Sequence, residues 1–267
     1  DLNLPPILKE LVMTKRGLIL IVGGTGSGKS TTLASLIDLR NQAADGHIIT
    51  IEDPVEYQLK GVVQIPVNEK KGLTFARGLR SILRHDPDKI MVGETPDPET
   101  AQIAVQSALT GHLVFTTVHA NNVFDVLGRF IHMGVDPYSF VSSLNCIVAQ
   151  RLVRLLCPEC RRRVKLTRDD FQFNRVDPKS FPNNVYEAVG CPECGDLGYS
   201  GRTAIGEILE LTDDIKEMIL QKKPTSEIKK VAMSQGMLPI RLNGLEKVKS
   251  GETSLDELNR VTIKEWL

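Results

Sequence analysis

Short apolar runs of strand length alternate with segments of helical periodicity over the first 150 residues of the chain. Runs rich in Val, Ile and Leu, each too short for a helix, predict buried strands at residues 18–22, 47–51, 89–93 and 112–117. Apolar residues spaced three or four apart predict helices at residues 4–13, 73–84, 97–108 and 123–133, with one more after the first strand. This alternation predicts an α/β fold with a mostly parallel sheet.

A long apolar stretch at residues 138–156 completes the predicted first domain. Near the C-terminus, helical patterns cover residues 212–220, 225–235, 245–249 and 254–261. Ser254 followed by Glu257 is read as a capping box at the start of the last helix. The predicted organisation is a P-loop core at 1–152, a tetracysteine module at 153–204 and a helical subdomain at 205–267.

The first strand runs directly into the sequence GGTGSGKS at residues 23–30, and a helix follows. This is the pattern G-x-x-x-x-G-K-[ST] in its required context, whose glycines let backbone N–H groups surround phosphate oxygens. Lys29 is predicted to reach the β- and γ-phosphates, and the Ser30 hydroxyl to bind Mg²⁺. The residues predicted to hold nucleotide here are Gly23, Gly24, Thr25, Gly26, Ser27, Gly28, Lys29, Ser30 and Thr31.

Acidic residues and a histidine follow the next strands, where a parallel sheet binds its ligands. Glu52 and Glu56 follow the second strand and are candidates for contact with Mg²⁺ and for activation of water. Glu94 ends the third strand, as in a Walker B strand with glutamate in place of aspartate. His119 follows the fourth strand and is a candidate sensor of the γ-phosphate. The alternatives are an acidic surface turn and a packing role for the histidine.

Arg77, Arg80 and Arg84 share one face of the predicted helix at 73–84, opposite its apolar face. They form either a solvated face or a phosphate contact within the same subunit or a neighbouring one. The spacing alone does not decide between these two.

Two C-x-x-C pairs, Cys157 with Cys160 and Cys191 with Cys194, stand 30 residues apart. Four thiolates from two short turns predict one tetrahedral structural Zn²⁺ site with no open coordination position. A rubredoxin-like iron site and two disulfides are the alternatives. Cys146 lies among apolar residues and is predicted to be an inert core thiol.

The composition is that of an ordinary globular protein, with 41% hydrophobic and 25% charged residues among 267. Thirty-three basic and 33 acidic residues balance to a net charge of zero, which argues against general attraction to nucleic acid. The basic run at 161–165 is interpreted as a solvated face or a protein contact. No apolar run has membrane-spanning length, so a cytoplasmic protein is expected.

Together these motifs resemble the secretion and pilus-assembly ATPases, in the branch that powers type II secretion and type IV pilus extension. The resemblance covers residues 4–262 and rests on the P-loop, on the sequence EDPVE at 52–56, on IMVGE at 90–94 and on a histidine box ending at His119. Arg80 and Arg84 fall where the family keeps arginines that reach nucleotide across a subunit boundary. The C-x-x-C pairs resemble the zinc module that the retraction ATPases lack.

The resemblance implies a RecA-like core that hydrolyses ATP with Mg²⁺ in a ring, expected to be a hexamer. Glu56 would be the general base, Glu94 would support the metal, and structural Zn²⁺ would complete the cofactors. Partners would be inner-membrane platform and cytoplasmic docking proteins of the machine, with the full-length protein peripheral to the inner membrane. This chain is expected to be the motor portion of that longer protein.

The sequence departs from the family pattern in two places. Thr95 and Pro96 stand where the family usually has Ile-Arg, and Gly24 stands where it usually has proline. Two other classes remain as alternatives, a nucleic-acid motor and a nucleotide-gated scaffold with weak turnover. Direct binding of nucleic acid is not expected, because aromatic stacking residues are scarce near the arginines.

Overall fold

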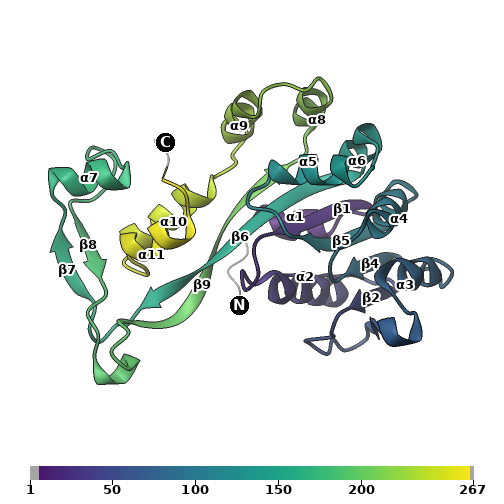
Figure 1. Ribbon diagram of the computed structural model, residues 1–267, viewed down its shortest axis with the longest axis horizontal. Helices are drawn as coiled ribbons and strands as arrows, with labels where there is room; N and C mark the ends of the chain where they lie inside the picture. Colours follow the sequence, from purple (N-terminus) through teal and green to yellow (C-terminus); the bar gives the residue numbers. More distant parts are fainter. Residues whose placement is uncertain (1–5, 265–267) are drawn as a thin grey trace. The chain divides into compact units, whose positions relative to one another are not determined.

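The computed structural model describes residues 6–264, and its centre is a seven-stranded sheet in the order β3-β2-β4-β5-β1-β6-β9 (Figure 1). The strands are β1 (Gly17–Val22), β2 (Ile48–Glu52), β3 (Val63–Pro66), β4 (Lys89–Val92), β5 (Leu113–Val118), β6 (Leu144–Leu156) and β9 (Tyr199–Glu210). β1 pairs in parallel with β5 and β6, and β2 pairs in parallel with β3 and β4. The predicted α/β class with a mostly parallel sheet is confirmed.

Helices cover both faces of this sheet. They are α1 (Pro6–Val12), α2 (Lys29–Ala43), α3 (Phe75–Ile82), α4 (Pro98–Leu109), α5 (Asp125–His132), α6 (Pro137–Ser143), α8 (Asp213–Leu220) and α9 (Thr225–Ser234). Alternate residues of β1 enter different cores, because successive side chains of a strand point to opposite faces. Leu18 and Leu20 pack with α3, α4 and α6, whereas Ile19 and Ile21 pack with α1 and α2. The core therefore has two apolar layers around one sheet.

The predicted strands and helices of the first 133 residues are present with bounds shifted by a few residues. β3 was not predicted from the sequence, because it is only four residues long and ends in Pro66. The apolar stretch at 138–156 contains two elements, helix α6 and strand β6, which a continuous apolar run does not separate. Asp136 caps α6 by accepting from the N–H of Ser139 at 2.7 Å, so the boundary is set by a cap.

The chain divides into two compact units, each made of two segments. The first contains residues 1–149 and 208–237, and the second contains residues 150–207 and 238–267. These units do not follow the predicted boundaries at 152/153 and 204/205, which stay predictions about domain organisation. β6 and β9 each contribute residues to both units.

The second unit packs a two-stranded antiparallel sheet and three helices around its own parts of β6 and β9. Its other elements are β7 (Arg162–Lys165), β8 (Asn184–Glu187), α7 (Arg168–Asn174), α10 (Ile240–Lys249), α11 (Leu255–Val261) and the 3₁₀ turn η2 (Pro192–Cys194). Val153, Phe171, Ile205, Val248 and Leu258 are among its core residues. This unit has an apolar core of its own.

The predicted capping box of Ser254 and Glu257 is only half formed at the start of α11. The N–H of Glu257 donates to the Ser254 hydroxyl at 3.1 Å, which is the first half of the box. Its carboxylate instead accepts from the backbone N–H and guanidinium of Arg154 and from the guanidinium of Arg260, at 2.7–2.9 Å. Burial favours the neutral acid most strongly, but these donors together outweigh it and lower the pKa of Glu257 to about 2. The buried carboxylate thus joins α11 to β6.

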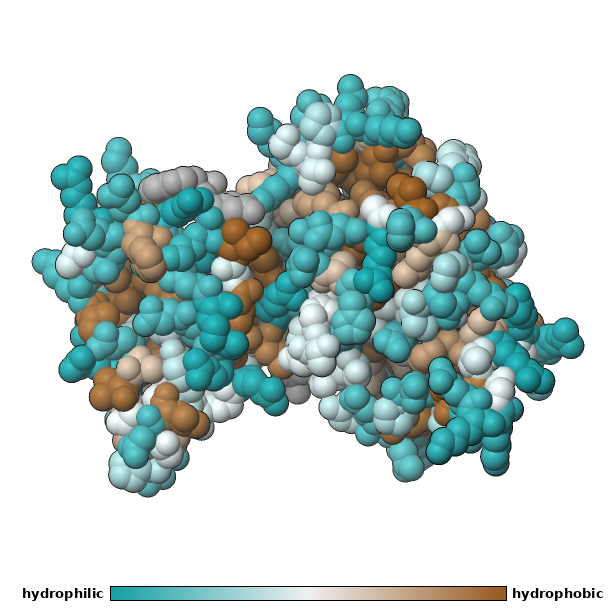
Figure 2. All heavy atoms as spheres, viewed as in Figure 1, coloured by the Kyte–Doolittle hydropathy of each residue, from teal (hydrophilic) through white to brown (hydrophobic). Residues whose placement is uncertain are grey.

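Several large apolar side chains of the described residues are exposed. Tyr138, Phe173, Val189 and Leu197 are the most exposed of those in the middle of the chain, and Figure 2 shows a largely hydrophilic face with separate apolar patches. Within residues 6–264, no helix has both the length and the apolar character needed to cross a membrane.

Candidate nucleotide site

The loop at residues 23–28 folds as a phosphate-binding loop between β1 and α2. Gly26 and Gly28 have φ angles of 74° and 87°, a backbone region that favours glycine, and Gly28 directly precedes the first turn of α2. The first N–H groups of a helix have no partner within it, so they are available to an anion. Lys29 Nζ donates to the carbonyls of Gly23 and Gly24 at 2.9 and 3.0 Å, which holds the ammonium against the backbone of the loop.

The acidic segment after β2 lines a cavity together with Lys29 and Ser30 of the loop. Glu52 ends β2 and is 9% exposed, and Glu56 follows in an exposed loop. The Tyr57 hydroxyl lies 3.0 Å from the hydroxyl of Thr31 in the first turn of α2. Through this contact the acidic loop is hydrogen-bonded to the helix that begins the phosphate site.

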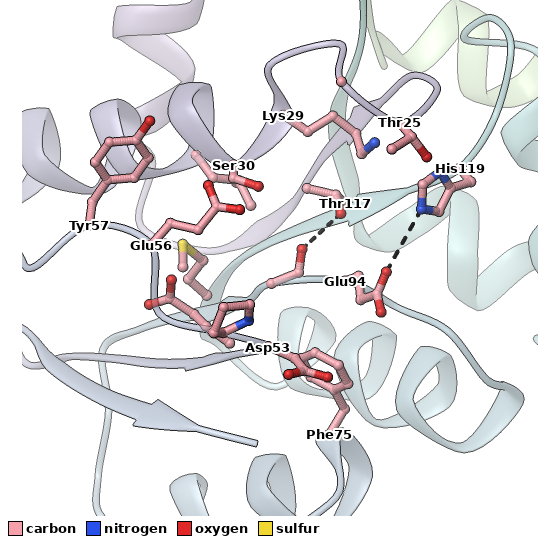
Figure 3. Close-up of a pocket in the computed structure, with 16 residues that line it drawn as sticks. Thr25, Lys29, Ser30, Asp53, Glu56, Tyr57, Phe75, Glu94, Thr117 and His119 are labelled. Atoms are coloured by element: carbon pink, nitrogen blue, oxygen red, sulfur yellow. Dashed lines mark hydrogen bonds and ion pairs between the residues drawn. The ribbon is translucent and has the colours of Figure 1, made fainter. Parts of the chain in front are cut away.

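Glu94 and His119 come from the ends of β4 and β5 and face each other. Glu94 Oε2 and His119 Nε2 are 3.8 Å apart, and both side chains are about half exposed (Figure 3). Thr117 fixes the backbone on either side of Glu94. Its hydroxyl donates to the Gly93 carbonyl at 2.8 Å, and its own carbonyl accepts from the N–H of Thr95 at 3.0 Å.

These groups open into one cavity of about 340 Å³, a volume within the usual range for small-molecule sites. It is lined by Thr25, Gly26, Lys29, Ser30, Leu33, Glu52, Asp53, Pro54, Glu56, Tyr57, Phe75, Met91, Gly93, Glu94, Thr117 and His119 (Figure 3). The structure therefore brings the loop lysine and serine together with the three predicted glutamates and His119. Phe75, Met91 and Thr117 line the cavity too, although no sequence motif singled them out.

The predicted arginines are absent from this lining. Arg80 is exposed and forms an ion pair with Glu99 of α4, and Arg84 is also exposed. Arg77 donates to the carbonyl of Gly72 at 3.2 Å. Within one chain the arginine row is thus a surface feature, and any contact with phosphate needs another subunit or a rearrangement.

Thr95, which departs from the family pattern, is buried. Its hydroxyl lies 2.9 Å from that of Thr116 in β5. Pro96 beside it comes one residue before the N-cap of α4. Thr95 and Pro96 thus form part of the connection between Glu94 and α4.

The four paired cysteines form a second candidate site, in the second unit. Their sulfur atoms all lie within 4.8 Å of one another, with three Sγ–Sγ distances of 3.7–3.9 Å. Tetrahedral Zn²⁺ with metal–sulfur bonds of about 2.3 Å requires sulfur atoms about 3.8 Å apart, so the geometry fits that ion. All four thiols are free, which excludes the disulfide alternative for this structure.

Backbone N–H groups point at the sulfur atoms, as expected for a cluster that holds thiolates. Cys194 Sγ accepts from the N–H groups of Cys191 and Gly198 at 3.3 and 3.1 Å. Desolvation raises the pKa of Cys194, but these hydrogen bonds and those with the thiols of Cys191 and Cys160 outweigh it and bring the pKa to about 7. The pKa of the neighbouring Cys191 is raised in turn. Cys146 is completely buried in the first unit, and burial raises the pKa of its thiol.

The fold and the cavity define a P-loop NTPase core with a tetracysteine cluster. A family model described as "Type II/IV secretion system protein" matches residues 4–260. The chain belongs to this family.

Relatives of the chain carry secretion and pilus names. It is 45% identical over 257 residues to the "Type II secretion system protein E" of Aeromonas hydrophila, covering 96% of this chain and 50% of that protein. It is 42% identical to the "Type IV pilus assembly ATPase PilB" of Myxococcus xanthus, covering 94% of this chain and 44% of that protein. The chain therefore spans about half the length of the curated relatives it matches.

A solved structure has the same fold. The crystal structure of "the Pilus Retraction Motor PilT and Bound ADP" aligns with a TM-score of 0.73 and 32% identity, covering 98% of this chain and 65% of that one.

Proposed function

We propose that this chain is the catalytic portion of an ATP-hydrolysing motor that powers type II secretion or type IV pilus assembly from an oligomeric ring. The observation that carries the proposal is the single cavity in which Lys29 and Ser30 of the loop meet Glu56, Glu94 and His119. Family membership and the ADP bound in the PilT crystal structure support ATP and Mg²⁺ as the ligands.

In this mechanism each residue has a defined task. The loop N–H groups, the N-terminus of α2 and Lys29 bind the triphosphate. Ser30 would hold Mg²⁺, which would supply Lewis-acid stabilisation of phosphoryl charge. Glu56 would accept a proton from the attacking water, and Glu52 and Glu94 would help to hold the metal. His119 beside Glu94 would sense the γ-phosphate.

The arginines are assigned to a neighbouring subunit's site. Arg80 and Arg84 lie exposed on one chain, which is the arrangement a contact across a ring boundary needs. Arginine supplied from a second chain stabilises charge that develops during phosphoryl transfer. We assign the ring as a hexamer that acts on inner-membrane platform and docking proteins at the cytoplasmic side. The Cys157, Cys160, Cys191 and Cys194 site is assigned to structural Zn²⁺.

The test is the ATPase rate per chain over a wide range of protein concentration. Specific activity is expected to climb with concentration, because a site shared between subunits forms only on assembly. Glu56→Gln is expected to lose at least about 100-fold in rate, whereas Glu69→Gln, at an exposed site on the surface, keeps the wild-type rate. Chains that bind MgATP but do not hydrolyse it at any concentration would instead be nucleotide-gated scaffolds.

A further inference from the structure

Gln64 in β3 makes three side-chain hydrogen bonds beside the candidate site without lining the cavity itself. Its Nε2 donates to Oε1 of Glu52 at 2.9 Å and to the carbonyl of Tyr57 at 2.8 Å. Its Oε1 accepts from the N–H of Leu59 at 2.8 Å. One amide group therefore contacts the end of β2 and two points of the loop that follows it.

The first consequence concerns the orientation of Glu52. Gln64 lies directly across from Thr50 in the parallel pairing of β2 and β3. The hydroxyl of Thr50 also donates to Oε1 of Glu52, at 2.6 Å. Two donors thus converge on one carboxylate oxygen. Oε2 receives no hydrogen bond within residues 6–264, so it is the oxygen available to a ligand in the cavity.

The second consequence concerns the loop that carries Glu56. Residues 53–62 join β2 to β3 without regular structure, and such a loop is mobile unless other groups hold it. Gln64 bonds the backbone at Tyr57 and Leu59, the first of which is the residue next to Glu56. The hydroxyl of Tyr57 also contacts the hydroxyl of Thr31. The residue next to Glu56 is therefore held twice, through its carbonyl by Gln64 and through its side chain by Thr31.

We propose that Gln64 is a positioning residue for the hydrolytic site, which orients Glu52 and the Glu56 loop through the same amide group. The inference rests on the proposed function for its kinetic consequence. Since Gln64 lines no part of the cavity, it acts only through the two glutamates. Positional errors of about 1 Å in a catalytic group cost about 100-fold in rate, so such a residue affects turnover more than binding.

Two variants of Gln64 distinguish a positioning role from a purely structural role. Gln64→Leu removes all three bonds, whereas Gln64→Glu keeps the acceptor for Leu59 but removes both donations and brings a second carboxylate to Glu52. Gln106→Glu is the matched control, since it adds the same charge at an exposed position of α4. Each protein is compared for kcat, for the Kd of MgATP and for amide exchange of residues 53–60.

Positioning predicts that both variants lose at least about tenfold in kcat while the Kd of MgATP changes less than about threefold. Gln64→Glu is expected to be the slower of the two, because like charges then oppose each other at Glu52. If Gln64 has only a structural role, Gln64→Leu is expected to be the slower variant, since Gln64→Glu retains one hydrogen bond and the shape of the side chain. Exchange of residues 53–60 is expected to become at least about tenfold faster in Gln64→Leu.

The other outcomes either overturn the inference about Gln64 or contradict the proposed function. Wild-type kcat in both variants overturns it, as does a parallel loss of kcat, binding and thermal stability. If the wild-type chain binds MgATP without hydrolysing it, the proposed function fails. Amide exchange then tests the role of Gln64 independently of hydrolysis. If Gln64→Leu leaves the exchange rates of residues 53–60 unchanged, Gln64 does not restrain the loop.

Discussion

The hydroxyl of Tyr57 lies 3.0 Å from the hydroxyl of Thr31, which connects the loop carrying Glu56 to the first turn of α2. Tyr57→Phe removes this contact and keeps the ring. An exposed hydrogen bond is worth about 0.5–1 kcal/mol, so kcat is expected to fall about two- to fivefold. The Kd of MgATP is expected to stay within about twofold.

Steady-state kinetics and nucleotide titration measure both quantities for Tyr57→Phe. Tyr138→Phe is the control, because that side chain is 67% exposed on α6. Turnover equal to wild type in Tyr57→Phe would show that the hydroxyl contact does not contribute to catalysis.

The Glu94–His119 pair is expected to matter for turnover and not for stability. An exposed ion pair contributes less than about 1 kcal/mol to folding, so Glu94→Gln should change the free energy of unfolding by less than about 0.5 kcal/mol. Its ATPase rate is expected to fall at least about 100-fold, because the carboxylate is assigned to holding the metal that stabilises phosphoryl charge.

A double-mutant cycle with His119→Ala measures the coupling of the pair in kcat and in urea unfolding. Glu227→Gln, an exposed glutamate of α9, serves as the control. A stability loss of several kcal/mol with near-normal turnover would make Glu94 a structural residue.

The cysteine cluster is expected to bind one Zn²⁺ per chain. Cys160→Ser removes one of four ligands and is expected to abolish stoichiometric zinc and to lower the melting temperature of the second unit. Cys146→Ala is the control, since Cys146 lies outside the cluster. Metal analysis of purified protein and thermal scans with and without chelator give the result. A coloured protein that contains iron instead would revive the rubredoxin-like alternative.

Glu257 makes the stability of the second unit depend on pH in the acid range. The pKa is about 2 in the folded chain, below the ordinary value, so the folded state binds fewer protons than the unfolded state. The stabilisation is fully present above pH of about 4.5 and is lost as pH falls toward 2. Glu257→Gln is expected to lower the free energy of unfolding at pH 7 by about 2–3 kcal/mol, allowing for solvent around the arginines.

Urea unfolding at pH 7, 5 and 3 tests this expectation. The difference between wild type and Glu257→Gln is expected to shrink at pH 3. Glu246→Gln removes an exposed pair with Lys249 in the same unit and should change little at any pH. A difference that stays constant down to pH 3 would assign the effect to packing.

The central site was predictable because its residues come in local motifs at the ends of strands. The loop at 23–30, Glu52, Glu56, Glu94 and His119 each follow a short apolar run, and a parallel sheet brings such ends together. Their positions after the predicted strands were therefore enough to predict that they lie near one another.

Other features depend on pairings that no local pattern encodes. Gln64 acquires its partners only when β3 pairs with β2 in a particular register. Glu257 has the spacing of a capping box, but Arg154, 103 residues earlier, competes for its carboxylate with a charged donor. The exposed Arg80 is a third case, because a single chain carries no information about a neighbouring subunit.

The segment at residues 208–237 has a consequence for how the protein is made. Leu209, Leu211, Ile215, Ile228, Ala232 and Met237 belong to the same apolar core as β1, β4 and β5. A ribosome releases the phosphate-binding loop about 200 residues before Met237, and the first unit needs the segment that ends at Met237 to complete its core. Until then, the apolar residues of the first unit that pack against this segment stay exposed, while the residues with the cysteine cluster are synthesised. A fragment that ends at residue 152 would lack the segment, so the same apolar residues would remain exposed in it.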